Sequence, residues 1–184
     1  YKQILDADPD HAVVLHLLGV INFQVGKNEI AVDLISKSVA IKPDYAEAHN
    51  NLGNTLKALK KLDEAADSYH KALTLNPDIL EAHNNLGNTL KDLGRLDEAV
   101  ACYHKALAIE PDFAEAHNNL GNALKILGKL DEAADSYHKA LAIKPEILEA
   151  HNNLGNVLKE LGKLDEAVDN YHKAIARKPE YAEA

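Results

Sequence analysis

The stretch AEAHNNLGNTLKALKKLDEAADSYHKALTLNPDI, residues 46–79, decides the fold, because similar stretches of 34 residues stand before and after it. The prolines mark the period, at Pro9, Pro43, Pro77, Pro111, Pro145 and Pro179. A strict period of this length is typical of a solenoid built from helical hairpins. We number the positions of each repeat from 1 to 34, which places the full repeats at residues 12–45, 46–79, 80–113, 114–147 and 148–181.

The two ends of the chain do not fill whole repeats. Residues 1–11 look like the end of an earlier repeat, since Tyr1 matches the column of Tyr69, Tyr103, Tyr137 and Tyr171. Residues 182–184 restart the next unit. We therefore expect one continuous array over residues 1–184, without a linker, that forms a piece of a longer array.

Composition excludes several classes of partner. The net charge is −9 with a pI of about 5.5, whereas nucleic acids and anionic membrane surfaces both require a basic face. No apolar run approaches the roughly 20 residues of a membrane span, and no signal peptide is visible, so a cytoplasmic location is favoured. The single Cys102 excludes an internal disulfide, and we expect it to serve packing.

Each repeat predicts two helices. In residues 46–79, His49, Leu52, Gly53, Leu56 and Leu59 follow the spacing of an amphipathic helix at positions 2–14. We expect this helix A to begin with Asp44 as N-cap, with Glu47 in capping-box spacing, and to end near position 15, where glycine takes a left-handed conformation.

Helix B is expected at positions 18–30. It begins with Asp63 as its N-cap, carries Ala65, Tyr69 and Ala72 on one face, and ends before Pro77. Lys60 stands where a glycine is due, which costs on the order of 1 kcal/mol if its backbone is left-handed.

The residues Leu52, Gly53, Ala65, Tyr69, Ala72 and Pro77 resemble the tetratricopeptide repeat pattern. The sequence departs from it at position 4, where histidine replaces the frequent tryptophan. The repeated string His-Asn-Asn-Leu-Gly-Asn (49–54, 83–88, 117–122 and 151–156) is also similar to the superhelical repeat region of O-GlcNAc transferases and their bacterial relatives. Together these features predict an all-α, right-handed superhelix of tetratricopeptide repeats.

A polar stripe lies opposite the core side of helix A, at positions 2, 5, 9 and 12 with position 6 at its edge. The resemblance to the repeat region of O-GlcNAc transferases implies that this stripe lines a concave face. In that family, asparagines at position 6 hold an extended peptide by its backbone. An amide offers donors and an acceptor that match a peptide group. The candidate peptide-binding residues are Asn50, Asn51, Asn54, Lys57, Asn84, Asn85, Asn88, Lys91, Asn118, Asn119, Asn122, Lys125, Asn152, Asn153, Asn156 and Lys159.

Other interpretations of these polar residues stay open. The asparagines could instead cap turns and bond across neighbouring helices. Lysine and asparagine could clamp a C-terminal carboxylate, as in some tetratricopeptide domains, although position 5 carries no lysine. The histidines recur at positions 4 and 25 of copied units, which argues against a metal site, and no catalytic constellation stands apart from the repeat pattern. We expect no cofactor and no enzyme activity in this chain.

The first repeat breaks the polar stripe with Val13, Leu17, Val20 and Phe23. A helix that is apolar on all sides is normally buried, so we expect another surface to cover these side chains. It could be a preceding part of the parent protein, a neighbouring molecule, or a bound partner for which Leu17, Val20 and Phe23 form an apolar anchor. The helix ends at Tyr1–Leu5 and Tyr171–Ile175 show no polar cap, which predicts end-to-end self-association.

The functional expectation is a scaffold that binds a protein or extended peptide. One alternative is the substrate-recruiting arm of a glycosyltransferase whose catalytic domain lies elsewhere in the parent chain. The other alternative is a structural self-assembling array.

Overall fold

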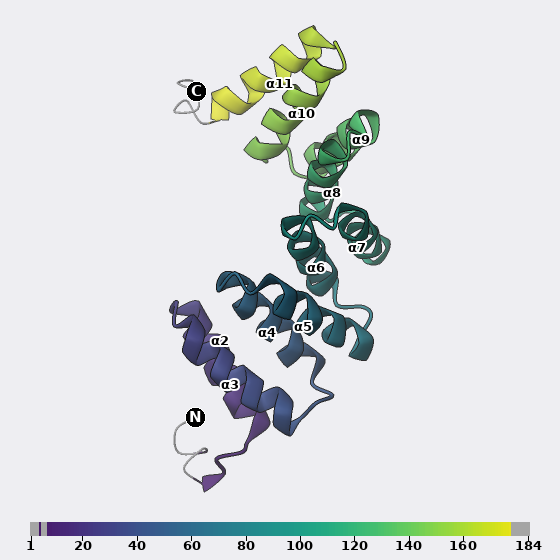
Figure 1. Cartoon of the computed structure of the whole chain (residues 1–184). Helices are drawn as coiled ribbons and strands as arrows, with labels where there is room; N and C mark the ends of the chain where they lie inside the picture. The colour runs from purple at the N-terminus through teal and green to yellow at the C-terminus, as the bar shows by residue number, and fades with distance from the viewer. Residues whose placement is uncertain (1–3, 5–6, 178–184) are drawn as a thin grey trace. The chain divides into compact units, whose positions relative to one another are not determined.

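The computed structural model describes residue 4 and residues 7–177 of the chain, and within these residues all regular structure is α-helical. The helices divide into two compact units, with the boundary between Gly94 and Arg95. The first unit contains α2–α6 and the second contains α7–α11 (Figure 1). The matches of Tyr1 to the tyrosine column and of residues 182–184 to a repeat start lie outside the described residues.

Each repeat is a pair of helices, as predicted. The first helices of the repeats, helices A, are α2 (Ala12–Gln24), α4 (Ala46–Ala58), α6 (Leu80–Asp92), α8 (Ala114–Ile126) and α10 (Leu148–Glu160). The second helices, helices B, are α3 (Asn28–Ile41), α5 (Leu62–Leu75), α7 (Leu96–Ile109), α9 (Leu130–Ile143) and α11 (Leu164–Arg177). Both kinds begin one residue before the predicted position, and helix A also ends one residue earlier.

The predicted N-caps were wrong. The N-cap of α4 is Tyr45 rather than Asp44, and its side chain makes no capping hydrogen bond. The N-cap of α5 is Lys61, so Asp63 lies inside the first helical turn. There its carboxylate still faces the positive end of the helix dipole, which is a weaker but favourable interaction.

The turn from helix A to helix B was predicted correctly. Gly26, Gly94, Gly128 and Gly162 have φ between 74° and 77°, and Lys60 has a φ of 62°. In the first repeat the amide of Lys27 donates to the carbonyl of Asn22 at 2.8 Å, which is the wide bond of a Schellman motif. A β-carbon on these glycines would meet nothing within 4 Å, so a larger side chain would not clash. Glycine is favoured at this position only because other residues rarely adopt a positive φ angle.

The paired helices pack through small residues. A β-carbon on Gly53 of α4 would lie 2.6 Å from the Tyr69 ring of α5. A β-carbon on Gly121 of α8 would lie 2.7 Å from the Tyr137 ring of α9. These tyrosines are fully buried, and so are Ala65 and Ala133 on the same helices. The lack of a side chain at position 8 therefore lets a tyrosine of helix B fill the space between the two helices.

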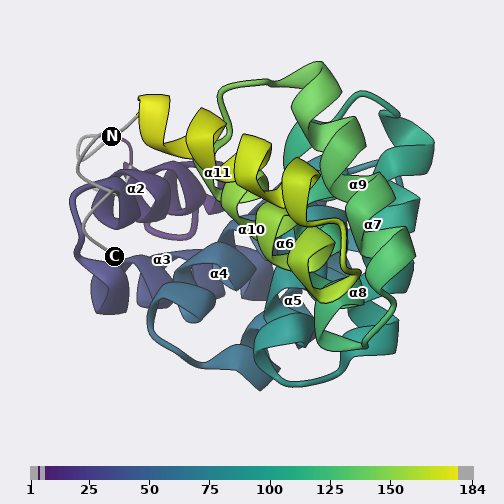
Figure 2. The same ribbon diagram turned by 90° about the horizontal axis from the view of Figure 1, so that it is seen from above.

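Neighbouring repeats stack within each unit. In the first unit α3 packs on α4 and α5 on α6, and in the second α7 packs on α8 and α9 on α10. The hairpin of α10 and α11 runs side by side in both views (Figures 1 and 2). Cys102 of α7 is buried, and desolvation raises the pKa of its thiol, in keeping with the expected packing role.

The histidines at position 4 have a structural task. In each case the Nε2–H group donates to the carbonyl of the proline that precedes helix A, at 2.8 to 3.0 Å. The four histidines are His49, His83, His117 and His151, and all are buried. Each side chain thus ties the loop before helix A to the helix itself. Neither these histidines nor the other described residues form a group of His, Cys, Asp or Glu able to hold a metal ion.

Candidate peptide-binding surface

The polar stripe of helix A, which we call the asparagine face, is tied together by amide–amide hydrogen bonds between repeats. In the first unit Asn85 Nδ2 of α6 donates to Asn54 Oδ1 of α4 at 3.0 Å. In the second unit Asn153 Nδ2 of α10 donates to Asn122 Oδ1 of α8 at 2.9 Å. The asparagine at position 6 thus bonds to the asparagine at position 9 of the repeat before it.

The tyrosines of helix B hold the same position-9 asparagines in place. The hydroxyl of Tyr69 donates to Asn54 Oδ1 at 2.7 Å, and the hydroxyl of Tyr137 donates to Asn122 Oδ1 at 2.6 Å. Tyr171 makes the same bond to Asn156 at 2.8 Å. Burial raises the pKa of Tyr69 and Tyr137, so both hydroxyls stay protonated and remain donors.

These bonds leave a donor and an acceptor free on adjacent amides of the first unit. Asn54 Oδ1 accepts two hydrogen bonds, while Asn54 Nδ2 donates none within the described part of the chain. Asn85 Nδ2 donates to Asn54, while Asn85 Oδ1 accepts no bond there. Both side chains are half-buried. The pair therefore presents one amide N–H and one amide oxygen in fixed orientation, which complements the C=O and N–H of a peptide backbone.

The second unit differs in one contact. Asn122 Nδ2 donates to Glu149 Oε1 at 3.1 Å, so this amide is engaged at both its nitrogen and its oxygen. Asn153 Oδ1 accepts no bond within the described residues. Asn119 and Asn156 are half-buried on the same face.

The position-5 asparagines lie in a different environment. Asn50, Asn84 and Asn118 expose 9%, 3% and 6% of their surface. The Oδ1 atoms of Asn50 and Asn118 are buried without a hydrogen-bond partner. Asn152 of the last full repeat is exposed. Little of the three buried side chains is therefore left for a ligand, and the accessible part of the asparagine face comes from positions 6, 9 and 12.

The lysines at position 12 line the edge of this face. Lys57, Lys91 and Lys125 are half-buried and Lys159 is exposed. Asn88 of α6, at position 9, is also half-buried. These residues form one set of positions in α4 and α6 of the first unit and another in α8 and α10 of the second unit.

Two adjacent hollows lie on the asparagine face of the first unit. One, of about 540 Å³, is lined by Ala46, Glu47, Asn50, Asn51, Asn54, Asn76, Ile79, Glu81 and Asn85. The other, of about 410 Å³, is lined by Phe23, Asn54, Lys57, Ala58, Lys60, Tyr69 and Asn85. They share Asn54 and Asn85, so the amide pair with the free donor and acceptor lies where the two hollows meet.

The first repeat joins this network through a histidine. Asn51 Nδ2 donates to His16 Nε2 at 2.8 Å, and His16 Nδ1 donates to the Tyr45 hydroxyl at 3.1 Å. The His16 and Tyr45 rings also meet edge to face. Of the predicted apolar anchor, Phe23 lies in a hollow beside the amide pair, while Leu17 and Val20 are half-buried and line neither hollow.

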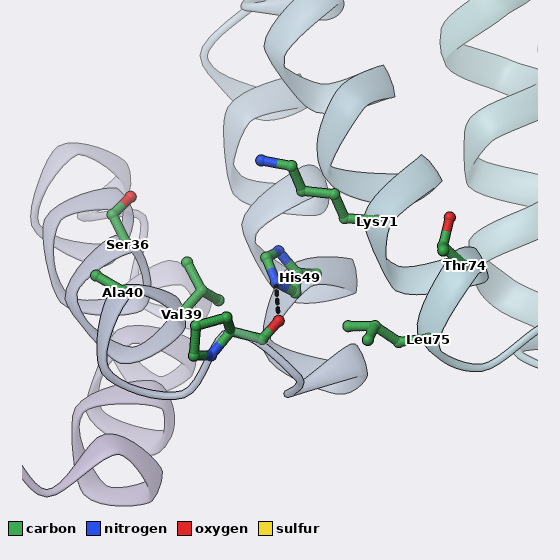
Figure 3. A pocket seen from close by; sticks show the side chains of 8 residues that line it. Ser36, Val39, Ala40, His49, Lys71, Thr74 and Leu75 are labelled. Carbon is green, nitrogen blue, oxygen red and sulfur yellow. Dashed lines mark hydrogen bonds between the residues drawn. The ribbon is translucent and has the colours of Figure 1, made fainter.

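A further hollow of about 500 Å³ lies between the helices B of the first two repeats. Figure 3 shows Ser36, Val39 and Ala40 of α3 on one side, Lys71, Thr74 and Leu75 of α5 on the other, and His49 between them. The position of Ser36 holds histidine in the four later repeats, and the position of Val39 holds leucine in the next three. The first repeat therefore lines this hollow with smaller side chains than the later repeats carry at the same positions.

Sequence reasoning missed several residues of the asparagine face. The tyrosines were assigned to the core alone, although each lies 15 residues after the asparagine that it holds. His16, at position 5 of the first repeat, was given no role in the sequence analysis. A signal for His16 exists, because the repeat that lacks asparagine at position 9 is also the one that carries histidine rather than asparagine at position 5.

The chain belongs to the tetratricopeptide repeat family. A model of the tetratricopeptide repeat family matches residues 46–79 and 148–181. Two further models of the same kind of repeat match residues 68–101, 87–126 and 121–162. No curated protein matched the sequence. The narrower resemblance to the repeat region of O-GlcNAc transferases remains a prediction.

Solved structures of tetratricopeptide proteins share the fold. A crystal structure of MamA is 25% identical, with a TM-score of 0.83 over 90% of this chain and 97% of that chain. A segment of MamA from Desulfovibrio magneticus RS-1 is 20% identical, with a TM-score of 0.86 over 93% and 97% of the two chains. YrrB, described as having an unusual peptide-binding site, is 22% identical, with a TM-score of 0.82 over 97% and 92%. The fold is thus an all-α solenoid of tetratricopeptide repeats.

Within the described part of the chain, no helix combines the length and the apolar character that crossing a membrane requires.

Proposed function

We propose that this chain is a non-catalytic scaffold that holds an extended polypeptide on its asparagine face. The observation that carries the proposal is the amide pair of Asn54 and Asn85. Their mutual hydrogen bond leaves one donor and one acceptor unused on the surface. A peptide backbone offers the complementary acceptor and donor at every residue, whatever its side chains.

The geometry of the second unit supports the same use. Asn153 has the same bond to Asn122 and the same unused oxygen. The cross-repeat bonds do not compete with peptide binding at Asn85 and Asn153, because each donates its Nδ2 to the repeat before it and keeps its Oδ1 for a ligand. Position 6 therefore serves the array and the ligand together. The peptide-binding site named for YrrB adds a precedent on the same fold.

The test is binding of a fluorescein-labelled library of peptides about nine residues long, which span roughly 30 Å when extended. The peptides are acetylated and amidated, so their ends carry no charge. Replacing Asn51 and Asn85 together by alanine removes the two position-6 amides of the first unit. At about 0.5–1.5 kcal/mol for each net hydrogen bond, we expect fluorescence anisotropy to show a loss of at least about 5-fold.

The matched control is Ile35→Val. Ile35 is fully buried on α3 and lines neither hollow of the asparagine face. We expect Ile35→Val to lower stability by about 0.5–1.5 kcal/mol while retaining binding. If binding falls equally with stability in both variants, the asparagines serve the array alone and the proposed function is wrong.

A further inference from the structure

We propose that the asparagine face of the first unit selects its peptide by charge at two neighbouring positions. A basic side chain enters the hollow that contains Glu47 and Glu81, and an acidic side chain enters the adjacent hollow that contains Phe23 and Lys60. This inference rests on the proposed peptide-binding function and specifies the chemistry of the partner.

The first hollow contains two carboxylates without cationic partners. Glu47 of α4 and Glu81 of α6 are exposed, and neither forms an ion pair or a hydrogen bond with another described residue. None of the nine residues that line this hollow is lysine, arginine or histidine. Two like charges that share one hollow repel each other, and a cation placed between them is attracted to both.

A second feature of this hollow points in the same direction. Asn50, which also lines the hollow, is 9% exposed, and its Oδ1 atom is buried without a hydrogen-bond partner. An uncompensated carbonyl dipole adds negative potential to that of the carboxylates. Lysine and arginine carry only donors, so their side chains complement the two carboxylates and the negative potential of the buried Asn50 oxygen, while the free donor of Asn54, which also lines the hollow, remains for the peptide backbone.

The adjacent hollow has the opposite charge. Lys57 and Lys60 line it, no acidic residue does, and Phe23 forms an apolar wall. Lys60 departs from the glycine column and keeps the left-handed backbone, with a φ of 62°. The departure introduces a cationic side chain at this position of the surface, where the other four turns carry none. A basic peptide side chain is repelled here, and an acidic one is attracted.

The shared wall of the two hollows keeps the two peptide side chains close together. Asn54 and Asn85 line both hollows, so a peptide backbone held by this amide pair passes from one hollow to the other. Its charged side chains then fall on either side of the same backbone contact. The expected ligand is an extended segment with one basic and one acidic side chain close together, rather than a uniformly charged tail.

The experiment uses the whole chain and the same end-blocked library, arranged as a positional scan. We expect enrichment of lysine or arginine at one position and of aspartate or glutamate at a neighbouring one, by about 1.4- to 5-fold for each ion pair on the scale of exposed pairs. The double variant Glu47→Gln with Glu81→Gln should lose the basic preference only. Lys60→Gln should lose the acidic preference only, and raising the salt concentration should weaken both preferences.

The matched control is Glu29→Gln with Asp33→Asn, which removes two exposed negative charges from α3 outside both hollows. It should leave both preferences unchanged. Peptides that bind without any charge preference, or a basic preference that the control variant also loses, would overturn the inference and leave the proposed function standing. A library that does not bind at all would overturn both.

Discussion

Replacing Lys60 by glycine should stabilise the protein. Lys60 holds a φ of 62° in a turn where Gly26, Gly94, Gly128 and Gly162 hold 74° to 77°. A residue with a β-carbon pays roughly 1–2 kcal/mol for this conformation. Glycine removes that cost but gains freedom in the unfolded chain, which offsets part of the benefit. We therefore expect a net gain of about 1 kcal/mol.

The size of the effect can be checked by the reverse change. A β-carbon at Gly26 would meet nothing within 4 Å, so Gly26→Lys adds backbone strain without a steric clash. Its cost should match the gain of Lys60→Gly in magnitude, about 1 kcal/mol. Urea denaturation measures both values, and hydrogen exchange of the turns at residues 25–27 and 59–61 shows whether the change is local. Local readout matters because the stability of a repeat array is distributed over neighbouring units.

The same variant separates stability from binding. If Lys60 attracts an acidic side chain of the partner, Lys60→Gly should lose that preference while the protein becomes more stable. A stability loss in Lys60→Gly, or a Gly26→Lys variant as stable as the wild type, would refute the strain argument at this turn.

Four further predictions concern packing, a hollow, protonation and association. Gly121→Ala places a β-carbon 2.7 Å from the Tyr137 ring and should cost about 1–3 kcal/mol in urea denaturation. Val39→Leu partly fills the hollow between α3 and α5 and should raise stability by up to about 0.8 kcal/mol for the added methylene, seen as a higher melting temperature. Burial lowers the pKa of His16 from its ordinary 6.5, so the unfolded chain takes up the proton first. The wild type should therefore lose stability relative to His16→Asn as the pH falls below about 6.5, measured by melting at several pH values. Val168 is 49% exposed on α11, and Val168→Glu should reduce any self-association that light scattering detects at high concentration.

The period of the sequence was sufficient to predict the helices. Proline and glycine columns bracket every hairpin, and the apolar spacing selects the buried faces, so the helix bounds were wrong by one residue at most. The N-caps were wrong because a cap depends on the φ and ψ angles of one residue in a short loop. Asp44 has the right chemistry, but the chain enters α4 only at Tyr45, one residue further on.

The composition of the asparagine face was predictable, but its bonding was not. Helical spacing places positions 5, 6, 9 and 12 on one side of helix A. Helical spacing does not say that Asn50 is buried while Asn54 remains half-buried at the surface. The burial of each side chain depends on how the neighbouring repeats stack. The link from Tyr69 to Asn54 joins two helices, and the link from Asn54 to Asn85 joins two repeats. Neither link follows from the pattern of one helix.

The first repeat shows how the array tolerates a change without losing the bond between repeats. Val20 stands at position 9, where the later repeats have the asparagine that accepts from the next repeat. The amide of Asn51 instead donates to His16, one turn earlier on α2, and Tyr45 accepts the remaining N–H of that imidazole. Because His16 supplies the acceptor, position 9 is released from its bonding task and can be apolar. Phe23 then lies one turn beyond Val20 and lines a hollow beside Lys60 and the amide pair. The apolar residues of the first repeat are therefore compatible with the hydrogen-bonded stacking of the array, and they give one end of the asparagine face a chemistry that its later repeats lack.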